Sequence, residues 1–181
     1  MLKLVCAFFL MMICFPAVAA EDDAGKSRPL NIAVVDVQQL MGVSKAGKSI
    51  QSQGKDIVEK YQKDMSGIQK DLKSAEKKVV DAQNAKDKEE FQKQFQAFQK
   101  ELKESQEESQ QLRMKNDQAV ADALNILRDE IVEIVDEMTV KNNYDLVITR
   151  ADVITVSKNI DITAEVMKEL DSRLKTVKVN R

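Results

Sequence analysis

The chain has 181 residues, enough for one ordinary domain or for a small domain with a long extension. Charged residues make up 32% of the chain and aromatic residues 4%, there is no histidine, and the formal net charge is −2. The absence of histidine excludes catalytic triads and common zinc sites that need this residue. The net charge gives no general affinity for nucleic acid. The overall composition is typical either of long solvated helices or of disorder.

Residues 1–20 are predicted to be a secretory signal peptide. Lys3 supplies a positive start, and residues 4–15 form an apolar stretch that is too short to span a bilayer as a stable helix. Small residues follow, and cleavage after Ala19 or after Ala20 fits the pattern. The alternative, a retained membrane anchor, is disfavoured by the short apolar stretch.

Cleavage at either position removes Cys6 and Cys14, the two cysteines of the chain. The exported protein then has no thiol with which to form a disulfide. Residues 21–30 are polar and are predicted to be a flexible leader.

Short β-rich segments flank a long helical region. Residues 31–37 are predicted to be a buried strand, with a short helix or turn over residues 38–44. Residues 144–149 and 153–156 are predicted to be two further strands that form a hairpin around residues 150–152.

A final helix is expected after Asp161, a candidate N-cap, because apolar residues then recur every fourth position at Ile162, Val166, Leu170 and Leu174. Segments 31–44 and 143–177 together form a predicted small β-rich body. Its candidate oligomer contacts are Ile32, Val34, Val35, Leu146, Ile148 and Ile154. A body of about fifty residues without disulfides or metal is marginally stable alone, so we expect an obligate oligomer.

Residues 45–142 contain no proline and mostly good helix formers. Apolar or small residues recur at spacings of three and four from Ile50 to Val79, as in a narrow coiled-coil seam. The same pattern runs from Phe91 to Leu102 and from Val120 to Met138. A weak polar stretch lies between these two parts, at Ser105, Ser109 and Asn116.

The seam is interrupted over residues 82–88, where Asn84 and Ala85 are the best turn candidates. One unbroken helix is an alternative, but an antiparallel hairpin is favoured because it pairs strong seam segments with strong ones and weak with weak, as at Gly54 and Asn116. Each arm would contain about 40 residues and extend roughly 60 Å. The predicted fold class is therefore mainly α with a small β body (α+β), carrying a long antiparallel coiled-coil hairpin arm.

The predicted tip of the arm gathers aromatic and basic residues. Phe91, Phe95 and Phe98 have the spacing of a seam and are expected mainly to fill it; with Lys86 and Lys88 they are also candidate contacts for a client protein. Residues 55–103 carry 12 lysines and 10 acidic residues, so this half of the arm has a small positive excess. That excess allows only a weak contact with an anionic membrane surface.

The segment Gly42-Val-Ser-Lys-Ala-Gly47-Lys48-Ser49 matches the pattern of a phosphate-binding loop. Such a loop leaves a strand directly, whereas residues 38–41 separate this one from the predicted strand. A kinked helix start, with Ser44 as a cap and Gly47 at a close contact, is the preferred interpretation. Paired carboxylates in a pocket-forming context are not evident, and neither a cofactor nor a metal site is predicted.

The order of these segments resembles the OmpH/Skp family of periplasmic chaperones. The resemblance rests on residues 32–36, Ala46-Gly47-Lys48, residues 144–148 and residues 161–166, within a chain that matches in architecture over nearly all of its exported length. It implies a periplasmic homotrimer shaped like a jellyfish, whose arms enclose a cavity for unfolded outer-membrane proteins. It also implies no use of ATP.

The better-known members of this family carry strongly basic arms, whereas Lys103-Glu104-Ser105 stands here where a basic cluster is expected. No lipopolysaccharide site is therefore carried over. The sequence favours an ATP-independent holding chaperone, not an enzyme, which protects unfolded outer-membrane proteins through many weak contacts. The alternative is an exported coiled-coil structural or adaptor protein of the cell envelope.

Overall fold

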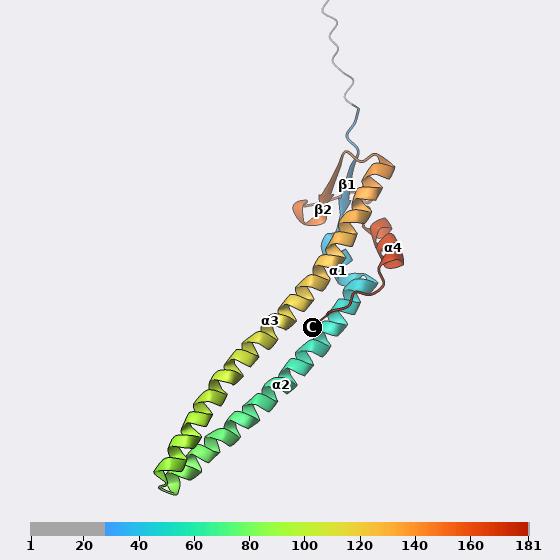
Figure 1. The fold of residues 1–181 in the computed structure, drawn as a ribbon. Helices are drawn as coiled ribbons and strands as arrows, with labels where there is room; N and C mark the ends of the chain where they lie inside the picture. The colour runs from blue at the N-terminus through green and yellow to red at the C-terminus, as the bar shows by residue number, and fades with distance from the viewer. Residues whose placement is uncertain (1–27, 181) are drawn as a thin grey trace, which may run out of the picture.

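A computed structural model describes residues 28–180, and the predicted signal peptide lies outside this part of the chain. A long helical hairpin extends from a small body that contains both flanking segments (Figure 1). The elements in chain order are β1 (Ile32–Val35), α1 (Val37–Val43), α2 (Lys45–Asn84), α3 (Lys88–Asn142), β2 (Leu146–Thr149), the 3-10 turn η1 (Arg150–Asp152) and α4 (Thr163–Arg173).

The predicted hairpin of two long helices is confirmed, and one unbroken helix is excluded. α2 ends at Asn84, and Lys86 has a φ of 55°, the left-handed conformation that reverses the chain. Asp87 then caps α3: its carboxylate accepts hydrogen bonds of 3.1 Å from the backbone N–H groups of Glu89 and Glu90. The turn therefore comprises Ala85, Lys86 and Asp87, so it includes the second residue of the predicted pair, whereas Asn84 is the last residue of α2.

The junction between α1 and α2 has the kinked form predicted from the sequence. The hydroxyl of Ser44 accepts a hydrogen bond from the backbone N–H of Gly47 at 3.1 Å and caps α2. Asp36 caps α1 in the same way, with its carboxylate 2.8 Å from the N–H of Gln39. A Cβ at Gly47 would lie 2.0 Å from the carbonyl oxygen of Met41, so this close approach of two helix ends requires glycine.

The described sheet has two strands, and they are parallel: Ile32 pairs with Leu146 and Val35 with Thr149. Parallel strands need a long crossover, and here the crossover contains α1 and both helices of the hairpin.

The predicted strand at residues 153–156 and its hairpin are wrong. Residues 150–152 form the turn η1, and the structure assigns no strand within 153–156. Ile154 is fully exposed, so the β-branched residues of this segment do not follow a buried face. A single bridge at Asp161 takes the third position instead: the N–H of Val34 donates to Ile160 at 2.8 Å, and the N–H of Ile162 donates to Val34 at 2.9 Å.

The core lies where the sheet, α4 and the end of α3 meet. Its buried residues are Ala33, Val35, Leu40, Ala46, Ile50, Ala123, Leu127, Ile131, Ile134, Ile162, Val166, Leu170 and Val177. The stretch of α3 from Ala123 to Ile134, which was predicted from the sequence to belong to the arm, therefore packs in the body. This enlarges the core beyond the two segments that were expected to form it.

The predicted apolar stripe of the last helix is confirmed for Ile162, Val166 and Leu170, which are buried, whereas Leu174 is half-buried and follows the end of the helix. α4 begins one residue later than expected: Ile162 occupies the N-cap position and provides no side-chain cap. Asp161 still contributes, because its carboxylate accepts a hydrogen bond of 3.0 Å from the N–H of Thr163.

After α4 the chain turns back along the hairpin. The side chain of Gln53 on α2 holds this tail, donating to the carbonyl oxygen of Val177 at 2.7 Å and accepting from the N–H of Val179 at 3.0 Å. Val177 is buried in the core cluster, which includes residues of both α2 and α3. In Figure 1 the tail runs back from α4 toward α2.

Candidate functional site

The tip of the hairpin brings together most of the residues predicted to contact clients. Phe91 and Phe95 stack with ring centroids 5.9 Å apart and an interplanar angle of 12°. Phe95 is 41% exposed, while Phe91 and Phe98 are half-buried, as expected for seam positions. Lys86 is exposed in the adjoining turn, and Lys88 is exposed at the start of α3. The tip thus presents one accessible aromatic ring and two exposed cations.

The seam between the two arms is closed by small residues near the tip and is open in its middle. α2 buries Ala75 and Ala82, whereas its larger seam residues Ile57, Tyr61, Met65, Ile68 and Leu72 remain partly exposed. Small side chains let two helices approach closely, and larger ones hold them apart. In the middle of the arm, part of the apolar surface of the seam is consequently exposed to solvent.

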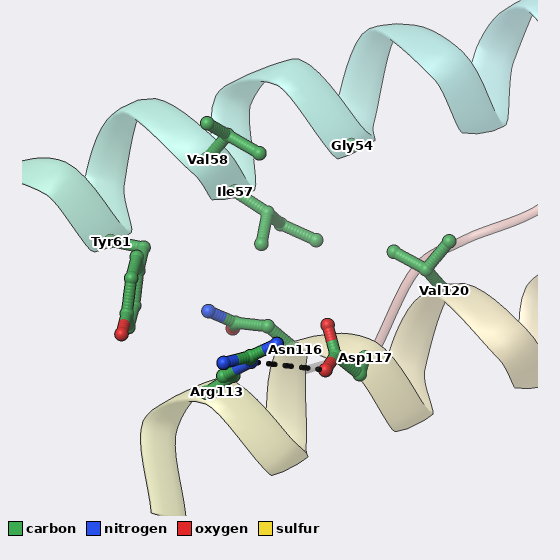
Figure 2. Close-up of a pocket in the computed structure, with 8 residues that line it drawn as sticks. All are labelled: Gly54, Ile57, Val58, Tyr61, Arg113, Asn116, Asp117 and Val120. Carbon is green, nitrogen blue, oxygen red and sulfur yellow. Dashed lines mark ion pairs between the residues drawn. The ribbon is translucent and has the colours of Figure 1, made fainter. Parts of the chain in front are cut away.

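A cavity of about 280 Å³ occupies the part of this open region nearest the body (Figure 2). It is lined by Gly54, Ile57, Val58 and Tyr61 of α2 and by Arg113, Asn116, Asp117 and Val120 of α3. Its surface is mainly apolar. Arg113 and Asp117 form an exposed ion pair of 3.8 Å at its edge.

Asn116 is the polar residue inside this cavity. It is 7% exposed, and its side-chain oxygen Oδ1 is buried without a hydrogen-bond partner among the described residues. A buried polar atom without a partner is uncommon in native structures and costs free energy. The sequence placed Asn116 opposite Gly54 as a weak point in the seam but did not predict the cavity between them.

A second hollow, of about 410 Å³, continues toward the tip. It lies between Tyr61, Met65, Ile68 and Leu72 on α2 and polar residues of α3 that include Ser105 and Ser109. The hydroxyl of Ser109 is 3.2 Å from the sulfur of Met65, which is a weak polar contact. A pair of larger apolar side chains at these positions would close the seam. The predicted polar middle of the arm is therefore a shallow apolar groove with a polar wall.

The charges of the arm are held mainly at its surface. Ion pairs one helical turn apart join Lys100 to Glu104 at 3.7 Å and Lys103 to Glu107 at 3.9 Å, with all four side chains largely exposed. Such pairs contribute little to stability. Residues 104–137 carry 3 basic and 10 acidic residues, so the returning helix is acidic while the tip half has a small positive excess.

Shifted pKa values in the body have structural causes. A hydrogen bond from the backbone of Asn31 and the guanidinium of Arg28 lower the pKa of Asp145. Hydrogen bonds from Thr163 and the charge of Arg150 lower the pKa of Asp161. Asp145 joins the residues before β1 to those before β2, and Asp161 joins the start of α4 to η1. Neither carboxylate lines the open groove of the arm.

Arg173 of α4 joins two acidic side chains at the junction of body and arm. Its Nε lies 2.7 Å from a carboxylate oxygen of Glu169, and its other nitrogens pair with Glu137 of α3. The hydrogen bond from Arg173 lowers the pKa of Glu137, and the two acidic partners raise the pKa of Arg173. This cluster fastens α4 to α3.

The residues that matched a phosphate-loop pattern do not form such a loop. Gly42 lies inside α1 and Gly47 inside α2, with a kink at Ser44 between them. Among residues 28–180 no group of three metal-ligating side chains occurs. Within the same part of the chain, no helix is both long enough and apolar enough to cross a bilayer.

The candidate oligomer contacts of the body divide by exposure. Val34 and Val35 are buried in the core of the protomer itself, and Ile32 and Ile148 are half-buried. Leu146 is 49% exposed, and Ile154 is fully exposed. These last two side chains are the ones available to another molecule.

Comparison with known proteins agrees with this architecture. A family model described as outer membrane protein (OmpH-like) matches residues 31–170. The chain belongs to the OmpH-like family. This membership agrees with the prediction that it is not an enzyme, since the family is one of non-enzymatic chaperones assigned to the periplasm.

A solved structure shares the fold of this OmpH-like protein. It is a candidate outer membrane chaperone (OmpH-like) from Caulobacter crescentus CB15, with a TM-score of 0.76 and 18% sequence identity. The match covers 85% of this chain and 91% of that one. No match was found among curated proteins.

Proposed function

We propose that this OmpH-like protein is an ATP-independent holding chaperone of the periplasm, which binds unfolded outer-membrane proteins and keeps them from aggregating. The observation that carries the proposal is the open seam of the arm. Its partly exposed residues, from Ile57 to Leu72, offer a long strip of apolar contacts beside a polar wall. Membership of the OmpH-like family supports the same function.

The mechanism we propose is steric and multivalent. An unfolded barrel protein exposes many apolar strands, and each makes a weak contact with the groove or with Phe95 at the tip. Avidity adds these contacts without any one of them being tight. Weak individual contacts let the client leave without ATP hydrolysis.

Oligomerisation completes the proposed chamber. Copies that associate through the body, using apolar side chains such as Leu146 and Ile154, would place several arms around a client. We propose a homotrimer, the state that the OmpH/Skp resemblance implies. Export by the predicted signal peptide would deliver the protein to the periplasm.

The deciding experiment dilutes a urea-unfolded outer-membrane barrel protein into buffer with and without this protein, and follows aggregation by light scattering. Suppression without ATP, at stoichiometric amounts, is the expected result. An envelope spacer or adaptor would leave aggregation unchanged and would copurify with one defined partner. That outcome would replace the chaperone with the adaptor.

A further inference from the structure

The protein already holds one segment of polypeptide through backbone hydrogen bonds to α2, namely its own tail. The carboxamide of Gln53 donates to the carbonyl oxygen of Val177 and accepts from the N–H of Val179. This is the pattern of a neighbouring β-strand, and Val34 makes the same pair of contacts with residues 160 and 162. A side-chain amide on α2 therefore recognises the backbone of an extended chain.

A second carboxamide of the arm, that of Asn116, belongs to the cavity described above. Gly54, which lines the cavity, directly follows Gln53, and Asn116 approaches the cavity from the facing helix (Figure 2). The Oδ1 of Asn116 is buried and has no partner among the described residues. An acceptor in this position lacks the N–H donor that the tail supplies to Gln53.

The cavity beside Asn116 has the size and polarity of a pocket for one side chain. Its volume of about 280 Å³ is slightly below the usual range for drug-sized ligands, and Ile57, Val58 and Val120 make its wall apolar. The ring of Tyr61 forms one side (Figure 2). An extended chain that donated an N–H to Asn116 could place an apolar side chain here.

We propose that this cavity binds an extended strand of an unfolded outer-membrane barrel protein: the carboxamide of Asn116 turns toward the client so that Oδ1 accepts one backbone N–H, and one apolar or aromatic side chain inserts between α2 and α3. The inference rests on the proposed function and specifies where a client is held. Barrel strands alternate apolar and polar residues and carry aromatic girdles, so every second side chain suits the cavity while its neighbours face water. The tail shows how a side-chain carboxamide of the arm holds the backbone of such a chain.

The experiment measures binding of a fluorescent ten-residue peptide of alternating apolar and polar residues, with a central tyrosine, to the full protein by anisotropy. A second peptide is methylated on the backbone nitrogen of that tyrosine, which removes the N–H donor. We expect methylation of the peptide to weaken its binding to the unchanged protein about tenfold, the effect of one lost hydrogen bond. Methylation should have little effect on peptide binding to the Asn116→Leu variant, which lacks the acceptor.

Two leucine substitutions form a matched pair. Gly54→Leu fills the cavity and should weaken peptide binding about tenfold or more, whereas Gly67→Leu, elsewhere on α2, should not. An added Cβ meets no atom within 4 Å at either glycine, so both variants are expected to fold. Thermal unfolding provides a separate check, because Asn116→Leu removes a buried unpaired oxygen and should unfold at the same or a higher temperature.

Peptide binding that is absent from the unchanged protein, or equal in all three variants, would overturn the inference and leave the cavity a feature of packing only. The aggregation assay is run on the same samples. Protection of a barrel protein together with such a negative peptide result would reject the cavity and keep the chaperone. Failure of the unchanged protein to protect would reject the chaperone itself.

Discussion

Gly47 lies where α1 and α2 meet, with the carbonyl of Met41 pressed against its α-carbon. An added Cβ would stand 2.0 Å from that oxygen, and backbone cannot rotate aside as a side chain can. We expect Gly47→Ala to lower the free energy of unfolding by about 2 kcal/mol or more. Urea denaturation followed by far-UV circular dichroism, at one protein concentration, measures it.

Gly42→Ala is the matched control for that change. Nothing lies within 4 Å of the Cβ it would add, and Gly42 is inside a helix. Its replacement should leave stability unchanged or raise it by up to about 1 kcal/mol. Equal denaturation midpoints for Gly47→Ala and Gly42→Ala would show that α1 and α2 can move apart at this contact without loss of stability.

Asp161 gives the fold a component of acid sensitivity. Its pKa is lowered chiefly by hydrogen bonds from Thr163 and also by Arg150, so the folded state favours its charged form. A lowered pKa contributes stability that is present above the unfolded value of about 3.9 and is lost as pH falls through the folded value. We expect Asp161→Asn to destabilise the protein at neutral pH and to flatten the loss of stability below about pH 4.

Thermal unfolding measured from neutral pH down to about pH 2 tests this expectation. Asp129→Asn, which removes the same charge from an exposed position on α3, is the control and should keep the slope of the unchanged protein. Parallel curves for Asp161→Asn and the unchanged protein would assign the acid response to other carboxylates.

Residues that act through near neighbours could be predicted from the sequence. Ser44 as a cap and Gly47 at a close contact follow from positions within a few residues of each other. Gln53 could not be recognised, because its partners lie more than 120 residues away and its role depends on how the tail returns. Asn116 was visible only as a polar residue opposite a glycine; the cavity between them depends on the separation of two helices.

Among the secondary-structure elements, the long helices with strong apolar periodicity were predicted well from the sequence, whereas the strands were predicted poorly from short β-rich runs. The arms repeat an apolar pattern over many turns, so their helices and their reversal were predictable. The segment around Ile154 has β-branched residues but no buried face, and Asp161 takes the edge of the sheet instead. Which short segment pairs with β1 depends on the core, which a local pattern does not contain.

The open middle of the arm should unfold locally more readily than the body. Residues 54–72 and 105–120 enclose the two hollows and bury few apolar side chains, whereas residues 127–138 of the same α3 contribute Leu127, Ile131 and Ile134 to the core. Hydrogen exchange read by mass spectrometry should show amides of the middle exchanging about tenfold faster or more. Uniform protection along α3 would mean a rigid arm and would remove the proposed adaptation to clients of different size.

The whole molecule is built unevenly. α2 has 40 residues and α3 has 55, and the additional length of α3 passes into the body, where Ala123 to Ile134 join the core. The arm is therefore anchored by one continuous helix on one side and by the kink at Ser44 on the other. Because α3 enlarges the core of the body, small size alone argues for association less strongly than the sequence suggested, and exposed apolar side chains become the better evidence.

Ile154 is the side chain that tests association most directly. It is fully exposed in the protomer, so Ile154→Lys has no apolar contact to lose within its own chain. If copies associate through the body, the change removes the burial of a large apolar residue, about 1.5–3 kcal/mol for each copy, and brings a charge into the interface. The dissociation constant for self-association should rise at least about tenfold, as sedimentation velocity over a dilution series would measure.

The matched control is Met114→Lys, which places the same charge at another exposed apolar position, on the arm. It should associate as the unchanged protein does. Protection of a diluted barrel protein should then fall for Ile154→Lys in proportion to the fraction dissociated, since separate arms no longer surround a client and avidity is lost. An Ile154→Lys protein that assembles normally would place the interface elsewhere on the body, and one that protects fully as a monomer would show that a single arm suffices and that no enclosed chamber is needed.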